Sequence, residues 1–314
     1  MKGSLTHRIY ERLNKPEYWF QPRQVLCKLG NIFGRTPHQA TVRLPWGIDF
    51  EVRTHETIGM SLLTYGVYEL AVSEVLWRLT DPGDWCLDVG ANIGYMAGLF
   101  AVKAGPLGRV FAFEPHPKVF ARLEVNVGRS LALVGAQGHA PVTLRQHAVG
   151  ATASETDLVE PEGFDENEGT AALAHVASPF NEQSVRHRVL VRPLDAVFAG
   201  EERFGVMKVD VEGAELAVFQ GAGRLLEQRR MRDIVFEDFQ PFPSECVTLL
   251  KRAGYAIRRI GKAIRGPVTW DPADVVAGRQ ALRWEPVNYL ATQDLKRAED
   301  RLRPRGWQCL RAVR

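Results

Sequence analysis

The chain has 314 residues, of which 45% are hydrophobic and 25% charged, and its formal net charge is +3. This composition excludes a disordered chain, and so small a net charge gives no argument for a nucleic-acid partner. The four cysteines are scattered without a C-x-x-C pair, which argues against a cysteine zinc site. No apolar run is long enough for a membrane span or a secretory signal, so we expect a cytoplasmic protein.

The first 55 residues predict an N-terminal helical and hairpin cap. Helical patterns cover about 5–13 and 16–33, and a hairpin of 41–44 and 48–53 turns at Pro45-Trp46-Gly47. The aromatic residues of this cap favour packing onto the main domain, with an acceptor pocket or a homodimer contact as alternatives. We expect a catalytic domain over 56–293. The basic tail, 294–314, is predicted to be helical to about Leu302 and to form a solvated surface, with a contact to phosphate or an anionic carrier as the alternative.

Residues 85–95 predict a buried strand that turns sharply into a helix. The turn Gly90-Ala-Asn-Ile-Gly94 contains two glycines, which let the backbone approach a ligand closely. Strand, glycine turn and helix together bind nucleotide-like cofactors in open α/β sheets. The dinucleotide fingerprint G-x-G-x-x-G is missing, and Asp88 would repel a pyrophosphate. A cationic ligand such as S-adenosylmethionine fits better.

A second apolar strand, 109–113, ends in Glu114-Pro115-His116-Pro117. An acid at the end of the second strand can accept hydrogen bonds from both ribose hydroxyls of an adenosine cofactor. The alternative is a solvated carboxylate at a strand end. The two prolines favour a rigid turn at His116 over a catalytic base, and they admit a new helix over about 118–127.

A third apolar strand carries charged residues at its end, in Lys208-Val-Asp-Val-Glu-Gly-Ala-Glu215. Side chains alternate along a strand, so Lys208, Asp210 and Glu212 are expected on one face. Crowded charges are costly unless they pair with one another or bind something. The alternative is a salt-bridged helix entry with Glu215 in the first turn of a helix over 214–227.

Four segments together carry a family resemblance, namely Asp88-Val-Gly-Ala-Asn-Ile-Gly94, Phe113-Glu-Pro115, Ala148-Val-Gly150 and Lys208–Glu215. With Gly66-Val-Tyr-Glu69 upstream, the chain resembles the FkbM family of S-adenosylmethionine-dependent methyltransferases from about residue 66 to 255. The resemblance implies an α/β fold with a doubly wound, mostly parallel, seven-stranded class I methyltransferase (Rossmann-like) sheet. It also implies methylation of a hydroxyl on a small molecule, natural product or glycan, without identifying the acceptor.

Positioning supplies much of the rate of an in-line methyl transfer, so we expect dedicated groups for cofactor, acceptor and proton. The residues predicted to bind the cofactor are Asp88, Gly90, Ala91, Asn92, Gly94, Glu114, Pro115, His147, Ala148 and Asp210. Among the catalytic residues, Asp210 is predicted to take the hydroxyl proton, with Lys208 stabilising a developing alkoxide as the alternative, and Glu212 is predicted to orient the acceptor. Tyr68, Glu69 and Glu237 are predicted to contact the acceptor.

Several alternatives stay open at this point. Asp210, Glu212, Glu237 and Asp238 offer oxygen ligands for a divalent cation, but no spacing demands a metal and we predict none. The irregular segment 155–187 is either a cover that helps select the acceptor or a surface insertion. A non-catalytic scaffold and a nicotinamide-dependent oxidoreductase remain as other classes of protein, the second lacking its glycine fingerprint.

Overall fold

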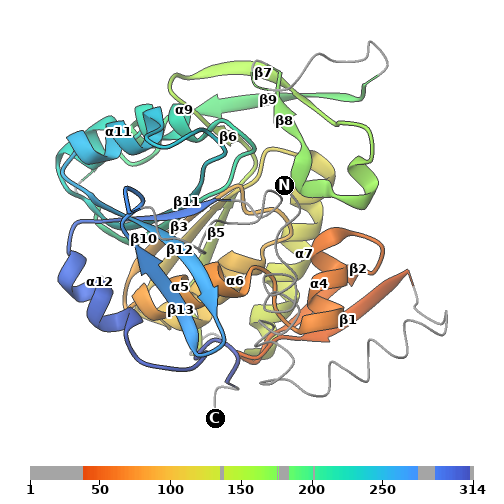
Figure 1. Cartoon of the computed structure of the whole chain (residues 1–314). Helices are drawn as coiled ribbons and strands as arrows, with labels where there is room; N and C mark the ends of the chain where they lie inside the picture. The colour runs from red at the N-terminus through yellow and green to blue at the C-terminus, as the bar shows by residue number, and fades with distance from the viewer. Residues whose placement is uncertain are drawn as a thin grey trace, which may run out of the picture.

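The computed structural model describes residues 38–134, 138–174, 176, 184–200, 202–274 and 287–311, so the helices predicted over 5–13 and 16–33 lie outside it. Its centre is an eight-stranded sheet in the order β13-β12-β14-β11-β10-β3-β4-β5 (Figure 1). The strands are β3 Trp85–Val89, β4 Arg109–Phe113, β5 Val142–Arg145, β10 Phe204–Val209, β11 Met231–Glu237, β12 Ala256–Ala263, β13 Gly266–Trp270 and β14 Asn288–Thr292.

The strands from β11 to β5 pair in parallel, and β14 lies antiparallel between β11 and β12. The predicted mostly parallel α/β sheet is confirmed. One strand exceeds the seven expected, because β12 turns back into β13 as an antiparallel hairpin at the edge. The final strand was also predicted correctly, over 288–293.

Helices cover both faces of this sheet, as a doubly wound fold requires. The alternation of the strands assigns residues to the two cores: Cys86 of β3 packs on one face, and Leu87 and Val89 pack on the other. The first face is covered by α5 Leu70–Leu79, α6 Tyr95–Ala104 and α7 Pro117–Val134. The second face is covered by α8 Leu194–Val197, α9 Glu215–Gln220, α10 Gly223–Glu227 and α11 Glu245–Arg252.

The single helix predicted over 214–227 is wrong in one respect, because the chain forms two short helices, α9 and α10. The reason lies in Asp195 of α8. Its carboxylate accepts hydrogen bonds from the amides of Arg224 and Leu225 at 2.7 and 3.1 Å, and its own amide donates to the carbonyl of Gly221. A side chain distant in sequence therefore caps a new helix start within the predicted one.

The predicted hairpin is confirmed as β1 Gln39–Arg43 and β2 Asp49–Arg53, followed by α4 Thr57–Tyr65. Trp46 in its turn and Phe50 in β2 are fully buried. The ring of Trp46 lies 5.3 Å from that of Tyr95, at the start of α6. The hairpin therefore belongs to the core beneath α5 to α7, and its Trp46 packs onto the main domain as expected. Further aromatic residues of the predicted cap lie outside the described residues, namely Tyr10, Tyr18, Phe20 and Phe33.

A smaller sheet in the order β6-β9-β7-β8 lies at the top of Figure 1. Its strands are β6 Ala148–Val149, β7 Ser154–Val159, β8 Ala172–Leu173 and β9 Arg186–Arg192. Two short 3-10 turns, η1 Phe164–Glu166 and η2 Glu168–Thr170, connect β7 to β8. The segment 155–187 is thus more regular than its sequence indicates in the part that the structure describes.

The tail begins with the predicted helix, α12 Leu295–Leu302. Arg297 is only partly exposed, whereas the other described basic residues of the tail are exposed, as the sequence favoured: Lys296, Arg301, Arg303, Arg305 and Arg311. Arg297 contacts Asp233 at 3.1 Å and Asp81 at 2.5 Å, and beyond the helix Trp307 and Cys309 are fully buried. The tail therefore packs against the main sheet and its helices. No helix in the described ranges is long and apolar enough to cross a membrane.

Candidate active site

A cavity of about 370 Å³ opens at the carboxyl ends of β3, β4, β10 and β11. Open α/β sheets bind their ligands at this edge. Most of the residues predicted for the site line this cavity together: Tyr68, Glu69, Gly90, Ala91, Asn92, Glu114, Pro115, Ala148, Lys208, Asp210, Glu212 and Glu237. Asp88, Gly94 and His147 do not line it.

The glycine turn is fixed to both neighbouring strands. Gly90 has a φ of +81°, and a Cβ there would lie 1.8 Å from the carbonyl oxygen of Asp210. The amides of Gly90 and Ala91 both donate to the carbonyl of Phe113, at 3.0 and 2.9 Å. Position 90 therefore requires glycine because the end of β3 contacts the backbone that follows β10. Close approach of a ligand would be a second reason for glycine at this position.

Two residues predicted to bind the cofactor make packing contacts outside the cavity wall. Gly94 begins α6 with a φ of +93°, and a Cβ there would lie 2.5 Å from Cδ1 of Leu123 in α7. The ring of His147 lies 5.3 Å from that of Phe113 in a tilted arrangement, and its Nδ1 lies 3.0 Å from the carbonyl oxygen of Ala148. Neither residue reaches the cavity, so any effect on a ligand is indirect.

Asp88 lies behind the cavity wall. It is fully buried in β3, beside its register partner Lys208 in β10. Burial raises the pKa of Asp88 to about 6, although Lys208 and the backbone amide of Ala97 favour its charged form. A carboxylate this deeply buried costs stability, which proteins commonly tolerate at functional sites. It supplies negative charge directly behind the glycine turn.

Glu114 joins the glycine turn to the end of β4. Its carboxylate accepts hydrogen bonds from the backbone amides of Asn92, at 3.0 Å, and His116, at 2.8 Å. Burial raises the pKa of Glu114 to about 7 despite these two bonds. A carboxylate has about four acceptor positions, so Glu114 retains capacity for the hydroxyls of a ligand.

Lys208 and Asp210 form an ion pair in the cavity wall, with 2.8 Å between Nζ and Oδ2. Burial alone would lower the pKa of Lys208, but the carboxylates of Asp210, Asp88 and Glu69 raise it above its ordinary value. The ammonium therefore stays charged. Asp210 follows the last residue of β10, and Glu212 lies in the turn beyond it. The predicted common strand face of Lys208, Asp210 and Glu212 is therefore wrong, although Lys208 and Asp210 are in contact.

Three further acids crowd the same region. Burial and the nearby Asp210 raise the pKa values of Glu69 and Glu237, and they raise that of Glu212 to about 7. Glu69 and Glu212 also adopt left-handed backbone conformations, with φ values of 43° and 52°. Strained backbone and perturbed carboxylates concentrate at functional sites. Tyr68, whose pKa is raised by burial and by Glu69, completes this wall.

Two acids near this cluster are committed elsewhere. Glu215 accepts hydrogen bonds from the amides of Val211 and Gly213, at 3.1 and 3.2 Å, which favours its reading as a residue of the helix entry. Asp238 accepts from the amide of Gln240 at 2.9 Å and from the hydroxyl of Ser244. Neither residue lines the cavity. Asp238 is therefore not placed with Asp210, Glu212 and Glu237 as a possible cation ligand.

The insertion between β6 and β9 forms part of the cavity wall, through Leu158, residues 167–171 and Leu173. Glu168 anchors it, because its buried carboxylate accepts from Arg53 of β2 at 2.6 Å and from Arg122 of α7. We call residues 164–173 the strap. Its position agrees with the hypothesis that this segment covers the site.

Residues 88–257 match the Methyltransferase FkbM domain, which is more than half of the chain. The chain belongs to the FkbM methyltransferase family. Among its curated relatives, the hexuronic acid methyltransferase AglP of Haloferax volcanii is 31% identical over 160 residues, covering 51% of this chain and 58% of AglP. The 31-O-demethyl-FK506 methyltransferase FkbM of Streptomyces tacrolimicus is 29% identical over 194 residues, covering 56% and 74%.

The AMB antimetabolite synthetase AmbE of Pseudomonas aeruginosa is 31% identical over 197 residues, which is 53% of this chain and 9% of AmbE. The alignments with AmbE and AglP thus span less than two thirds of those proteins.

S-adenosylmethionine is the cofactor of this FkbM family domain, and the charges of the cavity suit it. The cofactor carries a sulfonium and an ammonium and no phosphate. Among the described residues that line the cavity, Lys208 is the only basic side chain, whereas Glu69, Glu114, Glu168, Asp210, Glu212 and Glu237 are acidic. A cation relieves repulsion among such carboxylates, but a pyrophosphate would increase it.

The sequence missed the apolar part of this FkbM family site. The cavity wall also contains Ile58, Ile93, Tyr95, Met96, Phe113, Leu158, Leu173 and Phe239. Their apolar character predicted only burial, which is also what core residues require. Tyr95 illustrates the difficulty, since its hydroxyl lies 3.1 Å from that of Ser73 and 3.2 Å from the amide of Tyr68. Ser73 lies in α5 and Tyr95 in α6, so these side chains meet only because the fold packs the two helices together.

Proposed function

We propose that the protein is an S-adenosylmethionine-dependent O-methyltransferase whose acceptor is a hydroxyl of a small molecule, natural product or glycan. The observation that carries this proposal is the acidic cavity, in which one ion pair and several carboxylates of raised pKa face the same space. An alcohol must lose a proton as it attacks, and such a cluster supplies proton acceptors. The names of AglP and FkbM, methyltransferases of a hexuronic acid and of a 31-O-demethyl compound, support an oxygen acceptor.

For the cofactor, we propose that Glu114 accepts hydrogen bonds from the ribose hydroxyls. The backbone of the turn Gly90–Asn92 would hold the methionine part, with Asp88 supplying charge from behind. Pro115 and Ala148, which also line the cavity, would border the adenine. When bound, the cofactor supplies an electrophilic methyl group. The protein's contribution is to fix its orientation and to exclude water.

For the proton, the geometry favours Glu212 over Asp210, which the sequence predicted as the base. Asp210 is bound to Lys208 at 2.8 Å, and an ammonium partner weakens a carboxylate as a proton acceptor. Glu212 lines the same cavity with a pKa raised to about 7, close to the value at which a general base works well. In this proposal Lys208 and Asp210 act together, the ammonium stabilising negative charge on the acceptor oxygen.

The charge of the cavity also bears on the acceptor. A hydroxyl on a neutral part of a molecule avoids repulsion from Glu69, Glu212 and Glu237, while an anionic group near the reacting oxygen does not. We propose that Tyr68 and the strap contact the acceptor, since both line the cavity. Nucleic acid is disfavoured by the same reasoning.

The test combines S-adenosylmethionine with a panel of neutral polyols, macrolide alcohols and hexuronic acid glycosides, and measures S-adenosylhomocysteine. We expect turnover with neutral hydroxyls, and a kcat that rises with pH through about 7, because the base must be ionised. Glu212→Gln should lower kcat by about 10²–10⁴-fold and abolish this rise, while Asp210→Asn should retain it. If Asp210→Asn abolishes the rise of kcat with pH and Glu212→Gln retains it, the general base is Asp210. If only amines are methylated, the proposed hydroxyl acceptor is wrong.

A further inference from the structure

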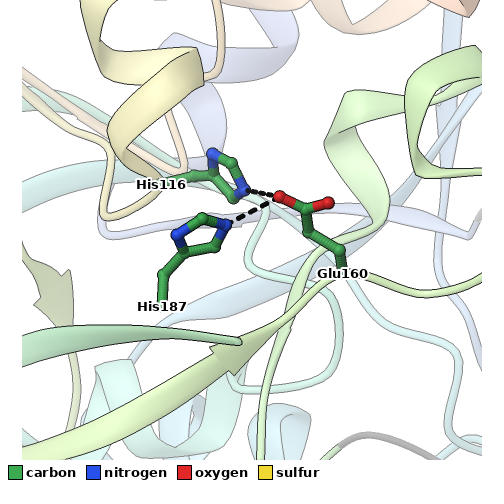
Figure 2. Close-up of side chains that lie close together, drawn as sticks. All are labelled: His116, Glu160 and His187. Carbon is green, nitrogen blue, oxygen red and sulfur yellow. Dashed lines mark hydrogen bonds and ion pairs between the residues drawn. The ribbon is translucent and has the colours of Figure 1, made fainter. Parts of the chain in front are cut away.

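Three side chains outside the cavity converge on one point, as Figure 2 shows. Nε2 of His116 lies 3.1 Å from Oε1 of Glu160, and Nε2 of His187 lies 2.7 Å from the same oxygen. The ligand atoms of the three residues all lie within 4.8 Å of one another. The side chains are 1%, 10% and 19% exposed for His116, Glu160 and His187, so their positions are fixed by packing.

We propose that His116, Glu160 and His187 bind one Zn²⁺ ion. Zinc takes imidazole nitrogen and carboxylate oxygen at about 2.0–2.2 Å in a tetrahedral arrangement, whose ligands are then about 3.3–3.5 Å apart. The observed separations of 3.1 and 2.7 Å need to open only slightly to admit the ion between them. Two imidazoles and one carboxylate favour zinc over calcium or magnesium, which prefer oxygen ligands. A water molecule completes the fourth position.

The three ligands come from separate parts of the fold, so the ion would connect them. His116 follows β4, Glu160 follows β7, and His187 lies in β9. The ring of His116 also stacks at 4.7 Å on Phe164, in the first turn of the strap. The amide of His116 donates to Glu114, the acid that we assign to the ribose. The zinc would therefore fasten the inserted sheet to the strand end that holds the cofactor.

One neighbouring cation competes for this position. Nζ of Lys118 lies 3.3 Å from Oε1 of Glu160, on a side chain that is 59% exposed. A long, exposed lysine side chain can turn into solvent when the ion binds. The sequence predicted no metal and assigned His116 to a rigid turn. The proposed zinc site is separate from the carboxylates of residues 210–238 that the sequence offered for a cation. Glu160 lies 44 residues after His116 and 27 residues before His187 in the chain.

The test uses the full chain, stripped with a chelator and titrated with ZnCl₂ by calorimetry, with Co²⁺ absorption as a second readout. We expect one Zn²⁺ per chain and a tetrahedral Co²⁺ spectrum. His187→Ala and Glu160→Gln should each weaken zinc binding by about 100-fold or more, since even residues that only support a ligand change affinity 10–100-fold. His139→Ala is the matched control, because His139 precedes β5 and so lies at the amino ends of the parallel strands, whereas His116 follows the carboxyl end of β4. Circular dichroism establishes that each variant is folded.

The result that would overturn the proposal is equally direct. A wild-type chain that takes up less than one equivalent of Zn²⁺, or folded His187→Ala and Glu160→Gln variants that bind it as tightly as the wild type, would show that these residues form only a hydrogen-bonded contact. An octahedral Co²⁺ spectrum would exclude the tetrahedral site. Because every readout is metal binding, the outcome does not depend on whether the proposed methyl transfer is correct.

Discussion

Removing the buried charge of Asp88 should stabilise the fold at alkaline pH and weaken cofactor binding. Burial raises the pKa of Asp88 from 3.8 to about 6, so the folded state binds this proton more tightly than the unfolded state. Protonated Asp88 therefore contributes to the free energy of unfolding at low pH, and this contribution is lost as the pH rises through about 6. One pKa unit corresponds to about 1.4 kcal/mol, so ionised Asp88 costs the fold about 3 kcal/mol.

The variant is Asp88→Asn, which keeps the shape and removes the charge. Urea unfolding at pH 4.5 and pH 8 measures the free energy of unfolding of the variant and the wild type. The linkage relation places about 2 kcal/mol of the cost between these two pH values, so the variant should gain that much relative to wild type on going to pH 8. Asp165→Asn, at an exposed position in η1, should show no such gain. A variant that loses stability relative to wild type at pH 8 would refute the reasoning, because it would mean that Lys208 makes the charge stabilising.

Two other changes test the contacts around the cavity. Gly90→Ala should destabilise the fold by more than about 3 kcal/mol, because its Cβ would lie 1.8 Å from the carbonyl oxygen of Asp210 at a positive φ. Gly128→Ala, whose Cβ would meet nothing within 4 Å in α7, should instead stabilise by about 0.5–1 kcal/mol, and thermal unfolding compares the two. Glu168→Gln should cost about 3 kcal/mol by leaving two guanidinium groups uncompensated, and should raise KM for the acceptor more than it lowers kcat. An unchanged KM would remove the strap from acceptor binding.

Where the chemistry is local, the residues predicted for the site line one cavity. Charged residues directly follow apolar strands, and parallel strands bring their carboxyl ends to one edge, so Glu114 was expected at the same edge as Lys208 and Asp210. The turn at Gly90 was recognised for the same reason. Its close contact with the carbonyl of Asp210 was not, because sequence spacing says nothing about the distance between two neighbouring turns.

The remainder depends on contacts between distant segments. The strap reaches the cavity because Glu168 meets Arg53 and Arg122, residues that are 115 and 46 positions away. The break between α9 and α10 depends on Asp195, which is 29 residues from the amide that it caps. Most basic side chains of the tail are exposed, as expected, but the contact of Arg297 with Asp81, 216 residues away, was not predicted. Such pairs become visible only when the fold places them side by side.

The central claim is that the acidic cavity binds S-adenosylmethionine through Glu114, and calorimetric titration tests it most directly. The wild type should bind S-adenosylmethionine with micromolar affinity and show no binding of NADH. Glu114→Gln should weaken cofactor binding about tenfold or more, a loss of about 1.4 kcal/mol or more, because an amide in place of a carboxylate loses acceptor positions. Glu227→Gln, at an exposed position of α10, should bind as the wild type does. Tight NADH binding without S-adenosylmethionine binding, or equal affinity in all three proteins, would contradict the account.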